Sequence, residues 1–391
     1  MGKIDVSIII PSYNKYPLNL LTLSSLEIQT FDLSRIEVIF IDDASTDETM
    51  KIKEEYSPSY EFRYIRCEKN IGRAKARNLG VQVARGTVLL FLDAEMLVAP
   101  QFIHAHLRHH EQNPNLIVTG ALELQSIYSF ILPGFSNEQL HELKQKIGSD
   151  DKVKNEYLKF RRQSEDAIQL LSIADIKHDQ LKSVSIKRSN MEKEITRKFG
   201  SSFTNFELPW LAFLSGNVSL TKASFDEAGW YDERFKGYGW EDRELGYRLH
   251  KLGKQFVFEK MAISYHQEHP ISKGKFQESM KNLRLFQEIH ADIDVLVLSL
   301  QYMNTRTKYN EINSILREYK KLCWKYPSEF TTFKSAYEAM LKRATYLLNE
   351  GVLVRKLLDQ MYEDLDKEIK HLTKLKKYKN LLNSFHKLLK M

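Results

Sequence analysis

The sequence predicts an α/β protein with a mostly parallel sheet and helices on both faces, followed by an all-helical segment. Short apolar, β-branched runs alternate with amphipathic stretches over roughly the first 120 residues, the pattern of strand–helix–strand units. Residues 276–391 hold one proline, one glycine and long runs of helix formers. We therefore expect an α/β domain over 1–275, with a polar helical insertion at about 125–205, and a basic helical domain over 276–391.

Five buried strands are expected in the first domain, at 6–10, 37–41, 62–65, 87–92 and 116–120. Helices are expected at 17–29, 46–56, 73–84, 100–112, 137–146 and 152–171. Ser45 and Glu48 have capping-box spacing, which would open the helix at 46. Ser136 and Gln139 would open the helix at 137 in the same way. The turn at 11–15 has no glycine, so neither a dinucleotide-binding turn nor a P-loop is expected.

Charge and cysteine content bound the compartment. Residues 1–275 hold 37 Lys+Arg and 37 Asp+Glu, and residues 276–391 hold 21 and 14, so the whole excess of 21 − 14 = +7 lies in the second domain. Cys67 and Cys323 form no CxxC pair, which fits a reducing compartment. No apolar run reaches 18–20 residues and a strand is expected almost at once. We therefore expect neither a transmembrane helix nor a signal peptide, and a cytoplasmic protein.

An acidic loop, Asp93-Ala94-Glu95, directly follows the apolar run at 87–92. The carboxyl ends of parallel strands are where open α/β sheets bind ligands. Two carboxylates so close together repel each other unless a cation or ligand hydroxyls hold them, and Mg²⁺ and Mn²⁺ take such oxygens together with substrate phosphates. The loop indicates a metal–diphosphate site; the alternative is a solvated acidic turn.

A second acidic cluster is the run Gly237-Tyr238-Gly239-Trp240-Glu241-Asp242. Two glycines around an aromatic residue form a loop that allows close approach of a ligand. The two acids then fall in the first turn of a helix, where the helix dipole favours anions. An aspartate at a helix start is often only a cap. Next to exposed aromatic rings, however, such carboxylates indicate a sugar-binding surface, so we place Tyr238, Trp240 and Glu241 at an acceptor.

Five ordered segments resemble family-2 glycosyltransferases of the GT-A fold: VSIIIPSYNK, VIFIDDAST, NIGRAKARNLG, LLFLDAEM and FLSGNVSLTKASFDEAGWYDERFKGYGWEDRELGYRL. The last resembles the galactosyltransferase-type second half of bacterial chondroitin polymerases and polypeptide N-acetylgalactosaminyltransferases. The resemblance covers residues 4–122 and 208–269. The insertion and the helical tail lie outside it.

The resemblance implies a nucleotide site at the matching positions. Pro11 and Tyr13 would line a uracil pocket, with Tyr13 as the stacking face. Asp43 would accept a hydrogen bond from the uracil N3–H. Arg73 would supply charge-assisted bonds near the nucleotide, with Arg77 as a second candidate.

The resemblance also implies a divalent cation, Mn²⁺ or Mg²⁺. Asp93 would contact the ribose or a metal-bound water, and Glu95 would be a ligand. The family usually has aspartate at the position of Glu95, so the position and affinity of the metal stay open. His266 matches the third ligand, with His269 as the alternative, although a lone histidine is more often a packing residue.

By the same resemblance, Asp242 is the catalytic base of an inverting enzyme. A positioned carboxylate is needed because an acceptor hydroxyl is a poor nucleophile at neutral pH. Tyr238 would contact the acceptor. Ser215, Gly216 and Asn217 would form the floor under the donor sugar, unless that segment is an ordinary turn.

These features predict a metal-dependent inverting glycosyltransferase that moves a hexose or N-acetylhexosamine from a UDP-sugar to a glycan or lipid-linked saccharide. One alternative is a transferase for a peptide Ser, Thr or Cys side chain, as in enzymes that glycosylate bacteriocins. A non-enzyme alternative is a sugar-binding scaffold with a decayed site. No nucleic-acid partner is expected.

The helical tail carries an apolar stripe that must be buried, either on the first domain or on a second copy. Its members are Met340, Ala344, Leu347, Val354, Leu358, Met361, Leu365, Leu372 and Leu375. We expect a homo-oligomer. Residues 367–391 hold eight lysines and one acid, Glu368. With interleaved leucines, that end also suits an anionic membrane surface, peripheral to its inner face.

Overall fold

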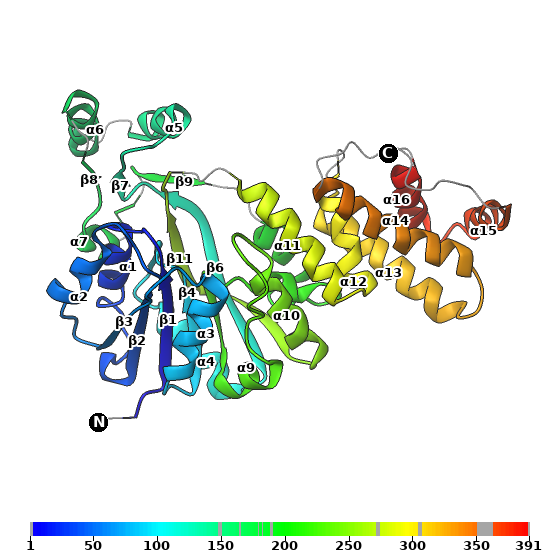
Figure 1. Ribbon diagram of the computed structural model, residues 1–391, viewed down its shortest axis with the longest axis horizontal. Helices are drawn as coiled ribbons and strands as arrows, with labels where there is room; N and C mark the ends of the chain where they lie inside the picture. The colour runs from blue at the N-terminus through cyan, green and yellow to red at the C-terminus, as the bar shows by residue number, and fades with distance from the viewer. Residues whose placement is uncertain are drawn as a thin grey trace. The chain divides into compact units, whose positions relative to one another are not determined.

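The computed structural model describes residues 3–147, 151–163, 166–178, 180–181, 183–187, 191–270, 274–303, 307–349 and 363–389 (Figure 1). The chain forms two compact units. The first comprises Met1–Phe203, Trp210–Lys236 and Glu241–Lys273, and the second comprises Thr204–Pro209, Gly237–Trp240 and Gly274–Met391. This division assigns two short segments before residue 274 to the second unit, whereas the division expected from the sequence at 275/276 stays a prediction.

The first unit is built on a mixed, mostly parallel sheet. Its strands are β1 (Val6–Ser12), β2 (Ile36–Asp42), β3 (Glu61–Arg66), β4 (Val88–Leu92), β5 (Met96–Val98), β6 (Leu116–Ile127), β9 (Ser185–Lys187), β10 (Asn217–Thr221) and β11 (Gln255–Gln267). They lie in the order β3-β2-β1-β4-β10-β6-β11-β5, with β9 paired to β6. Strands β1 to β4 are parallel, as are β6 and β11, whereas β10 runs antiparallel to both of its neighbours.

Helices cover both faces of this sheet. They are α1 (Leu18–Ser25), α2 (Lys51–Glu55), α3 (Arg73–Val83), α4 (Phe102–Gln112), α9 (Lys222–Ala228) and α10 (Glu241–Lys251). On one face of β1, Ile8 and Ile10 join a buried cluster that includes Leu23 of α1 and Phe102 of α4. On the other face, Ile9 lies against α3 at Gly80. Because β1 is buried on both faces, its central run Ile8–Ile10 is continuously apolar rather than alternating. The predicted fold class is confirmed.

The insertion lies at the end of the sheet where the parallel strands finish (Figure 1). It contains α5 (Asn137–Ile147), α6 (Asp151–Gln163), α7 (Ile173–Lys177), α8 (Met191–Phe199) and the hairpin of β7 (Phe130–Ile131) with β8 (Ile168–Gln169). Its apolar residues form a core with residues of α1 and β5. The predicted capping box of α5 is confirmed: Gln139 N donates to Ser136 Oγ, and Ser136 N donates to Gln139 Oε1.

Several element boundaries differ from those expected. The capping box predicted at Ser45 is wrong. Asp47 caps a short 3-10 turn (Glu48–Met50) before α2 instead, and Ser45 Oγ accepts from Asn14 N. Strand β1 continues through Pro11 to Ser12, because β1 pairs with β2 as far as its last residue. Helix α6 ends at Gln163, short of the expected residue 171. Strand β6 runs well past its expected end at residue 120, and with β11 it carries the sheet towards the insertion.

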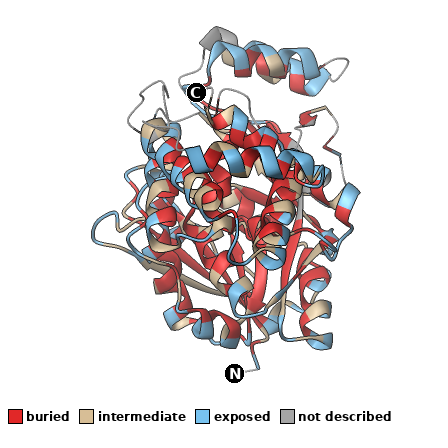
Figure 2. Ribbon diagram, turned by 90° about the vertical axis from the view of Figure 1, so that its right-hand side faces the viewer, coloured by how far each residue is buried: buried red, intermediate tan, exposed pale blue. Residues whose placement is uncertain are grey.

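The second unit is helical. It contains α11 (Lys275–Ile289), α12 (Ile293–Leu296), a 3-10 turn (Val297–Gln301), α13 (Tyr309–Lys325), α14 (Thr331–Asn349), α15 (Glu363–Lys374) and α16 (Lys379–Leu389). Figure 2 shows buried residues gathered on the inner faces of the helices. Helix α14 packs against α11, α15 and α16, and α13 packs against α16.

The apolar stripe of the tail is buried within the second unit itself. Met340, Ala344, Leu365 and Leu372 are all fully buried there, and Glu368, the one charged interruption, accepts from Phe333 N at the start of α14 at 2.7 Å. Residues 354, 358 and 361 lie outside the described residues. Leu347 and Leu375 are part-buried. The expectation that the stripe needs the first domain or a second copy is wrong for the four buried members, because neighbouring helices already cover them.

The same packing applies to the basic end. Its leucines at 372, 381, 382 and 388 are buried, so the apolar side needed for a membrane-surface helix faces the interior of the unit. No helix within the described ranges is long and apolar enough to cross a membrane.

Gly246 lets α10 pack closely on the segment before β10. A Cβ at this position would lie 2.6 Å from Phe213 Cβ and 2.7 Å from the Trp210 carbonyl oxygen. We expect Gly246→Ala to lower the free energy of unfolding by about 1–3 kcal/mol, the cost of overpacking, although alanine is the better helix former. Denaturant unfolding measures this. The control is Lys251→Ala, an exposed position of the same helix, which should change stability little. A stabilised Gly246→Ala would contradict the packing.

Candidate active site

The ends of three neighbouring parallel strands form one edge of the sheet in the first unit. Strand β1 leads into the turn Tyr13-Asn14-Lys15, β2 ends at Asp42, and β4 is followed by the acidic loop at 93–95. Since β1 pairs in parallel with both β2 and β4, these three segments meet at the same edge. This is the position where open α/β sheets bind ligands.

Asp42 and Asp43 have different partners. Asp42 is buried and accepts from Ser45 N, Tyr64 Oη and Arg66. The two oxygens of Asp43 accept from Ile71 N at 2.7 Å and Gly72 N at 3.0 Å. Asp43 therefore holds the turn that opens α3. The Cys67 thiol is a further hydrogen-bond partner of this carboxylate, which with its four lone-pair sites retains acceptor capacity for a ligand donor.

Three predicted nucleotide residues lie around this edge. Pro11 is part-buried within β1, and Tyr13 lies just beyond the strand with 46% of its surface exposed. Arg73 is the first residue of α3, and its side chain is 42% exposed, 3.9 Å from Glu241. An exposed ring and an exposed guanidinium at a strand edge can meet an incoming nucleotide without rearrangement of the core.

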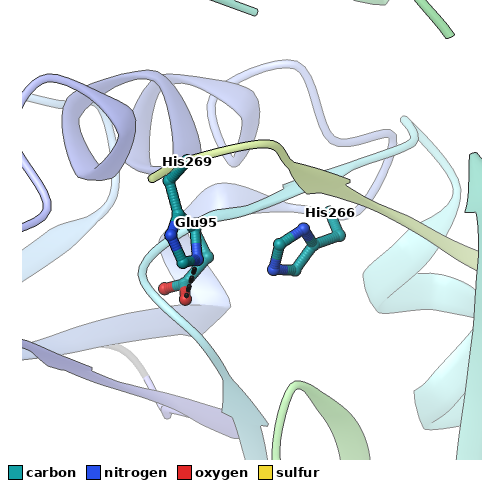
Figure 3. A group of neighbouring side chains, drawn as sticks. All are labelled: Glu95, His266 and His269. Carbon is teal, nitrogen blue, oxygen red and sulfur yellow. Dashed lines mark ion pairs between the residues drawn. The ribbon is translucent and has the colours of Figure 1, made fainter. Parts of the chain in front are cut away.

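Glu95, His266 and His269 form a group that could hold a metal ion (Figure 3). One ligand atom from each lies within 4.8 Å of the others, and the figure shows the two imidazoles turned towards the carboxylate. Glu95 follows β4, whereas His266 lies in β11, paired with Met96 of β5. Asp93, also predicted to contact the metal, is not in this group. The structure thus joins Glu95 to both candidate histidines rather than to one of them.

The insertion supports this group. Gln139, which closes the capping box of α5, also donates through Nε2 to the His269 carbonyl at 3.0 Å. The His269 Nδ1 lies 2.9 Å from the Pro270 carbonyl, so Nδ1–H donates there and Nε2 carries the lone pair. A histidine whose second nitrogen donates to a carbonyl is held in the orientation typical of a metal ligand.

Lys15 completes the charge balance at Glu95. The Lys15 Nζ lies 2.8 Å from Glu95 Oε1 and 3.1 Å from His269 Nε2. Burial would raise the pKa of the Glu95 carboxyl, but the ammonium of Lys15 outweighs burial and holds that pKa well below its usual range. Burial lowers the pKa of His266, which favours the neutral, metal-binding form of its imidazole.

Arg77 joins the acidic loop to the start of α10. Its side chain is 2% exposed, and its two terminal nitrogens lie 2.9 Å from Asp93 Oδ1 and 3.0 Å from Glu241 Oε1. The ring of Tyr231 lies 5.5 Å from the guanidinium carbon. Arg77 was the second nucleotide candidate after Arg73. Its bonds to two carboxylates of the protein indicate that it is a structural link.

Asp242 lies in the first turn of α10, next to Glu241. Burial, and then the neighbouring Glu241 carboxylate, raise the pKa of Asp242 to about 6. Its Oδ1 accepts from Arg243 N at 2.7 Å. A carboxyl with a pKa close to neutrality is suited to general-base catalysis, since it is ionised at pH 7 and still basic enough to take a proton.

Gly216 and Asn217, two residues of the predicted floor under the donor sugar, lie in different surroundings. A Cβ on Gly216 would lie 3.1 Å from Asp93 Oδ2, so this glycine does border the acidic loop. The prediction for the Asn217 side chain is wrong. It points into the sheet core, where Oδ1 pairs with His106 Nε2 and Nδ2 donates to the Ala262 carbonyl and to Ser264.

Two of the three predicted acceptor residues are buried. Trp240 is 2% exposed, its indole N–H donates to Ser279 Oγ at 3.1 Å, and its ring packs on Phe286. Glu241 is 3% exposed and ion-paired with Arg77. Neither side chain is open to an acceptor, so both predictions are wrong. Tyr238 is 41% exposed, with the Lys275 ammonium 5.2 Å from its ring.

The fold and this site define the class of protein. A mixed sheet with an acidic loop after β4, and a carboxylate at the start of a helix tied to that loop, has the architecture of GT-A glycosyltransferases. Residues 7–161 match glycosyl transferase family 2, and residues 196–270 match the family described as the N-terminal domain of galactosyltransferase. The uncharacterized glycosyltransferase YfnE of Bacillus subtilis strain 168 is 30% identical over 81% of the chain and 78% of that protein. The chain belongs to glycosyltransferase family 2.

Other relatives are longer than the matched region. Validoxylamine A glucosyltransferase of Streptomyces hygroscopicus subsp. jinggangensis is 32% identical over 63% of the chain, which spans 52% of that enzyme. Chondroitin synthase of Escherichia coli is 27% identical over 70% of the chain, which spans 36% of that enzyme. The solved structure of S. aureus TarS 1-349 with UDP is 15% identical, with a TM-score of 0.44, over 98% of this chain and 92% of that one.

Sequence reasoning missed Lys15 and gave His269 second place. Lys15 ends the segment PSYNK and His269 lies three residues after His266, so both were within reach of the motifs. Neither has a periodic or capping pattern that would reveal its partner. The pairing of Lys15 with His269 crosses 254 positions of the chain, and only the assembled sheet brings the two together.

We expect Arg77→Met to lower the free energy of unfolding by about 3–5 kcal/mol, because it leaves the buried carboxylate of Glu241 without its main partner. Denaturant unfolding measures this loss. The double variant Arg77→Met/Glu241→Gln, which also removes the buried charge, should recover a large part of it. Lys75→Met, at an exposed position of the same helix, is the control. A loss below about 1 kcal/mol in Arg77→Met would contradict the structural link.

Proposed function

We propose that this glycosyltransferase is a metal-dependent, inverting enzyme that moves a hexose or N-acetylhexosamine from a UDP-sugar. The observation that carries the proposal is the link Asp93–Arg77–Glu241. It ties the loop bearing Glu95 to the helix turn bearing Asp242, whose pKa is near 6. A donor-binding loop and a general base are thereby held in one rigid arrangement.

The donor nucleotide would lie across the strand ends. The exposed ring of Tyr13 would stack on the uracil, and Asp43 would accept from its N3–H through the lone pairs left by Ile71 and Gly72. Arg73 would approach the anionic part of the donor, since its guanidinium is exposed at the N-terminus of α3. Gly216 would leave room for the sugar next to Asp93.

Glu95, His266 and His269 fit a divalent cation. Two imidazoles and one carboxylate suit Mn²⁺ better than Mg²⁺, which prefers an all-oxygen shell. The orientation of His269 by Pro270 and Gln139 supports the fit. A bound cation would neutralise the charge that develops on the leaving UDP. Asp93, paired with Arg77, would contact the ribose.

Asp242 would supply the base. Its carboxylate takes the proton of the acceptor hydroxyl as that oxygen attacks C1 of the sugar, and the bond from C1 to the UDP oxygen breaks. Attack from the face opposite the leaving group inverts the configuration at C1. Glu241, buried against Arg77, keeps a negative charge beside Asp242 and so keeps it basic.

A saccharide is the acceptor that we propose. Two relatives reported above are named validoxylamine A glucosyltransferase and chondroitin synthase, and chondroitin is a polysaccharide. Peptide glycosylation is the alternative to be tested by mass spectrometry of candidate acceptors. We propose neither a homo-oligomer nor a membrane surface, because most of the described apolar residues invoked for them are buried within the second unit.

Replacing Asp242 by Asn should lower turnover by about 10²-fold or more, with little change in UDP-sugar affinity. In the wild type, kcat/KM should rise with pH through a pKa of about 6, because the ionised carboxylate is the active form. The variant should lose this rise. UDP release at several pH values measures both. Transfer at a near wild-type rate by the variant would refute the base.

Ionisation of Asp242 should raise activity but lower the stability of the fold. The pKa of Asp242 is about 6 in the folded state and 3.8 in model compounds. Its ionisation therefore costs folding free energy, and this loss develops as the pH rises from about 4 to about 6. At pH 8 we expect Asp242→Asn to be more stable than the wild type in denaturant unfolding. Lower activity together with higher stability separates a buried base from a structural aspartate.

Excess chelator should abolish UDP release, and added Mn²⁺ should restore it. Glu95→Ala, His266→Ala and His269→Ala should each raise the Mn²⁺ concentration needed for half-maximal activity by about tenfold or more, since each removes one ligand. His104→Ala, at an exposed position of α4, is the control. Full activity in excess chelator would show that the group at Glu95 has a metal-free role.

A further inference from the structure

The Lys15 ammonium is hydrogen-bonded to two of the atoms that would ligate the cation. Lys15 Nζ lies 2.8 Å from Glu95 Oε1 and 3.1 Å from His269 Nε2, and these two acceptors are 3.5 Å apart. An ammonium only donates hydrogen bonds, so the His269 Nε2 lone pair is directed at the Lys15 charge. The same carboxylate oxygen and the same imidazole lone pair are the ones a metal ion would take.

We propose that Lys15 is an internal cation, which neutralises Glu95 in the metal-free enzyme, gives way to the metal ion and then binds the diphosphate of the nucleotide. This inference rests on the metal site proposed above. Without a cation, the Glu95 carboxylate, 16% exposed, would have to be desolvated unpaired, which is costly. Lys15 removes this cost and keeps the ligands together before the metal binds.

The local structure allows the Lys15 side chain to leave Glu95 without moving the backbone of the turn Tyr13-Asn14-Lys15. On one side, Asn14 N donates to Ser45 Oγ, and Asn14 Oδ1 accepts from Thr46 N. On the other side, Tyr16 N donates to Asp47 Oδ2 at 2.8 Å. The backbone around Lys15 is therefore held by the turn after β2. The Lys15 side chain is 22% exposed and can swing on its four methylenes while Tyr13 stays in place.

The displaced ammonium has a natural anionic partner. A metal held by Glu95 would also be coordinated by diphosphate oxygens. The diphosphate would then lie close to Glu95 Oε1, the former partner of the Lys15 ammonium. Before displacement, the ammonium competes with the metal for two ligands and repels it. After displacement, the same charge attracts the nucleotide. Removal of the charge should therefore change the two affinities in opposite directions.

The test uses the full chain with Lys15→Met. Mn²⁺ binding without nucleotide is followed by the electron paramagnetic resonance of free Mn²⁺, and UDP binding at saturating Mn²⁺ by calorimetry. We expect Lys15→Met to bind Mn²⁺ about tenfold more tightly and UDP about tenfold more weakly, the scale of one charge-assisted contact. Lys15→Arg, which keeps the charge, should lie closer to the wild type in both measurements.

The control is Lys222→Met. Lys222 pairs with Asp226 and donates its backbone N–H to Thr87, at the opposite end of β4 from Glu95, so both affinities should be unchanged. Thermal melting checks that each variant is folded, and Lys15→Gln replaces the methionine variant if that one is not.

Unchanged or weaker Mn²⁺ binding by Lys15→Met, with wild-type binding intact, would overturn the inference while the metal site stands. Unchanged UDP affinity would likewise overturn it. If neither protein bound Mn²⁺, the proposed metal dependence would fail first, and the inference with it. Mn²⁺ binding by the wild type therefore distinguishes failure of the metal site from failure of the inference about Lys15.

Discussion

The buried guanidinium of Arg77 is the constraint on which the arrangement of the site depends. A full positive charge at 2% exposure is tolerable only if carboxylates meet it with good geometry, and Asp93 and Glu241 do so at 2.9 and 3.0 Å. One of these acids comes from the loop after β4 and the other from the first turn of α10. Neither element can move away without leaving a charge unpaired in the interior. The distance between the acidic loop at 93–95 and Asp242 is therefore set by electrostatics as well as by packing.

This arrangement also explains how two close carboxylates coexist in the loop Asp93-Ala94-Glu95. Each has its own cationic partner from a different element: Arg77 of α3 for Asp93, and Lys15 of the turn after β1 for Glu95. The protein therefore offsets the mutual repulsion of these two carboxylates with two separate cations. The two partners differ in character. Arg77 is locked in a fork of hydrogen bonds, whereas Lys15 is a flexible point charge that can be exchanged.

The glutamate at position 95 fits the same picture. Its longer side chain reaches both Lys15 and the His269 Nε2. The histidines come from the end of β11 and from the residues just after it. The insertion adds the bond from Gln139 to the His269 carbonyl. A residue of the insertion, within the stretch 7–161 that matches family 2, therefore supports a residue of the candidate metal group.

The sequence by itself determined five strands of the sheet, the first helices between them and the two acidic clusters. Apolar runs of strand length, helical periodicity and Asp-x-Glu after a strand are local patterns, and local patterns survive without knowledge of the rest of the chain. The match to glycosyltransferase family 2 rests on such ordered segments. The capping box at Ser136 is of the same kind.

Only the tertiary structure decided which way individual side chains point and what they meet. Asn217 follows a glycine in a motif-like run, yet its amide is consumed by His106, Ala262 and Ser264 within the sheet. Trp240 and Glu241 directly precede the base in sequence, yet both are buried. Lys15 and His269, far apart in the chain, meet at Glu95. The physical reason is that burial and pairing of polar groups depend on contacts between distant segments, and no short pattern encodes these.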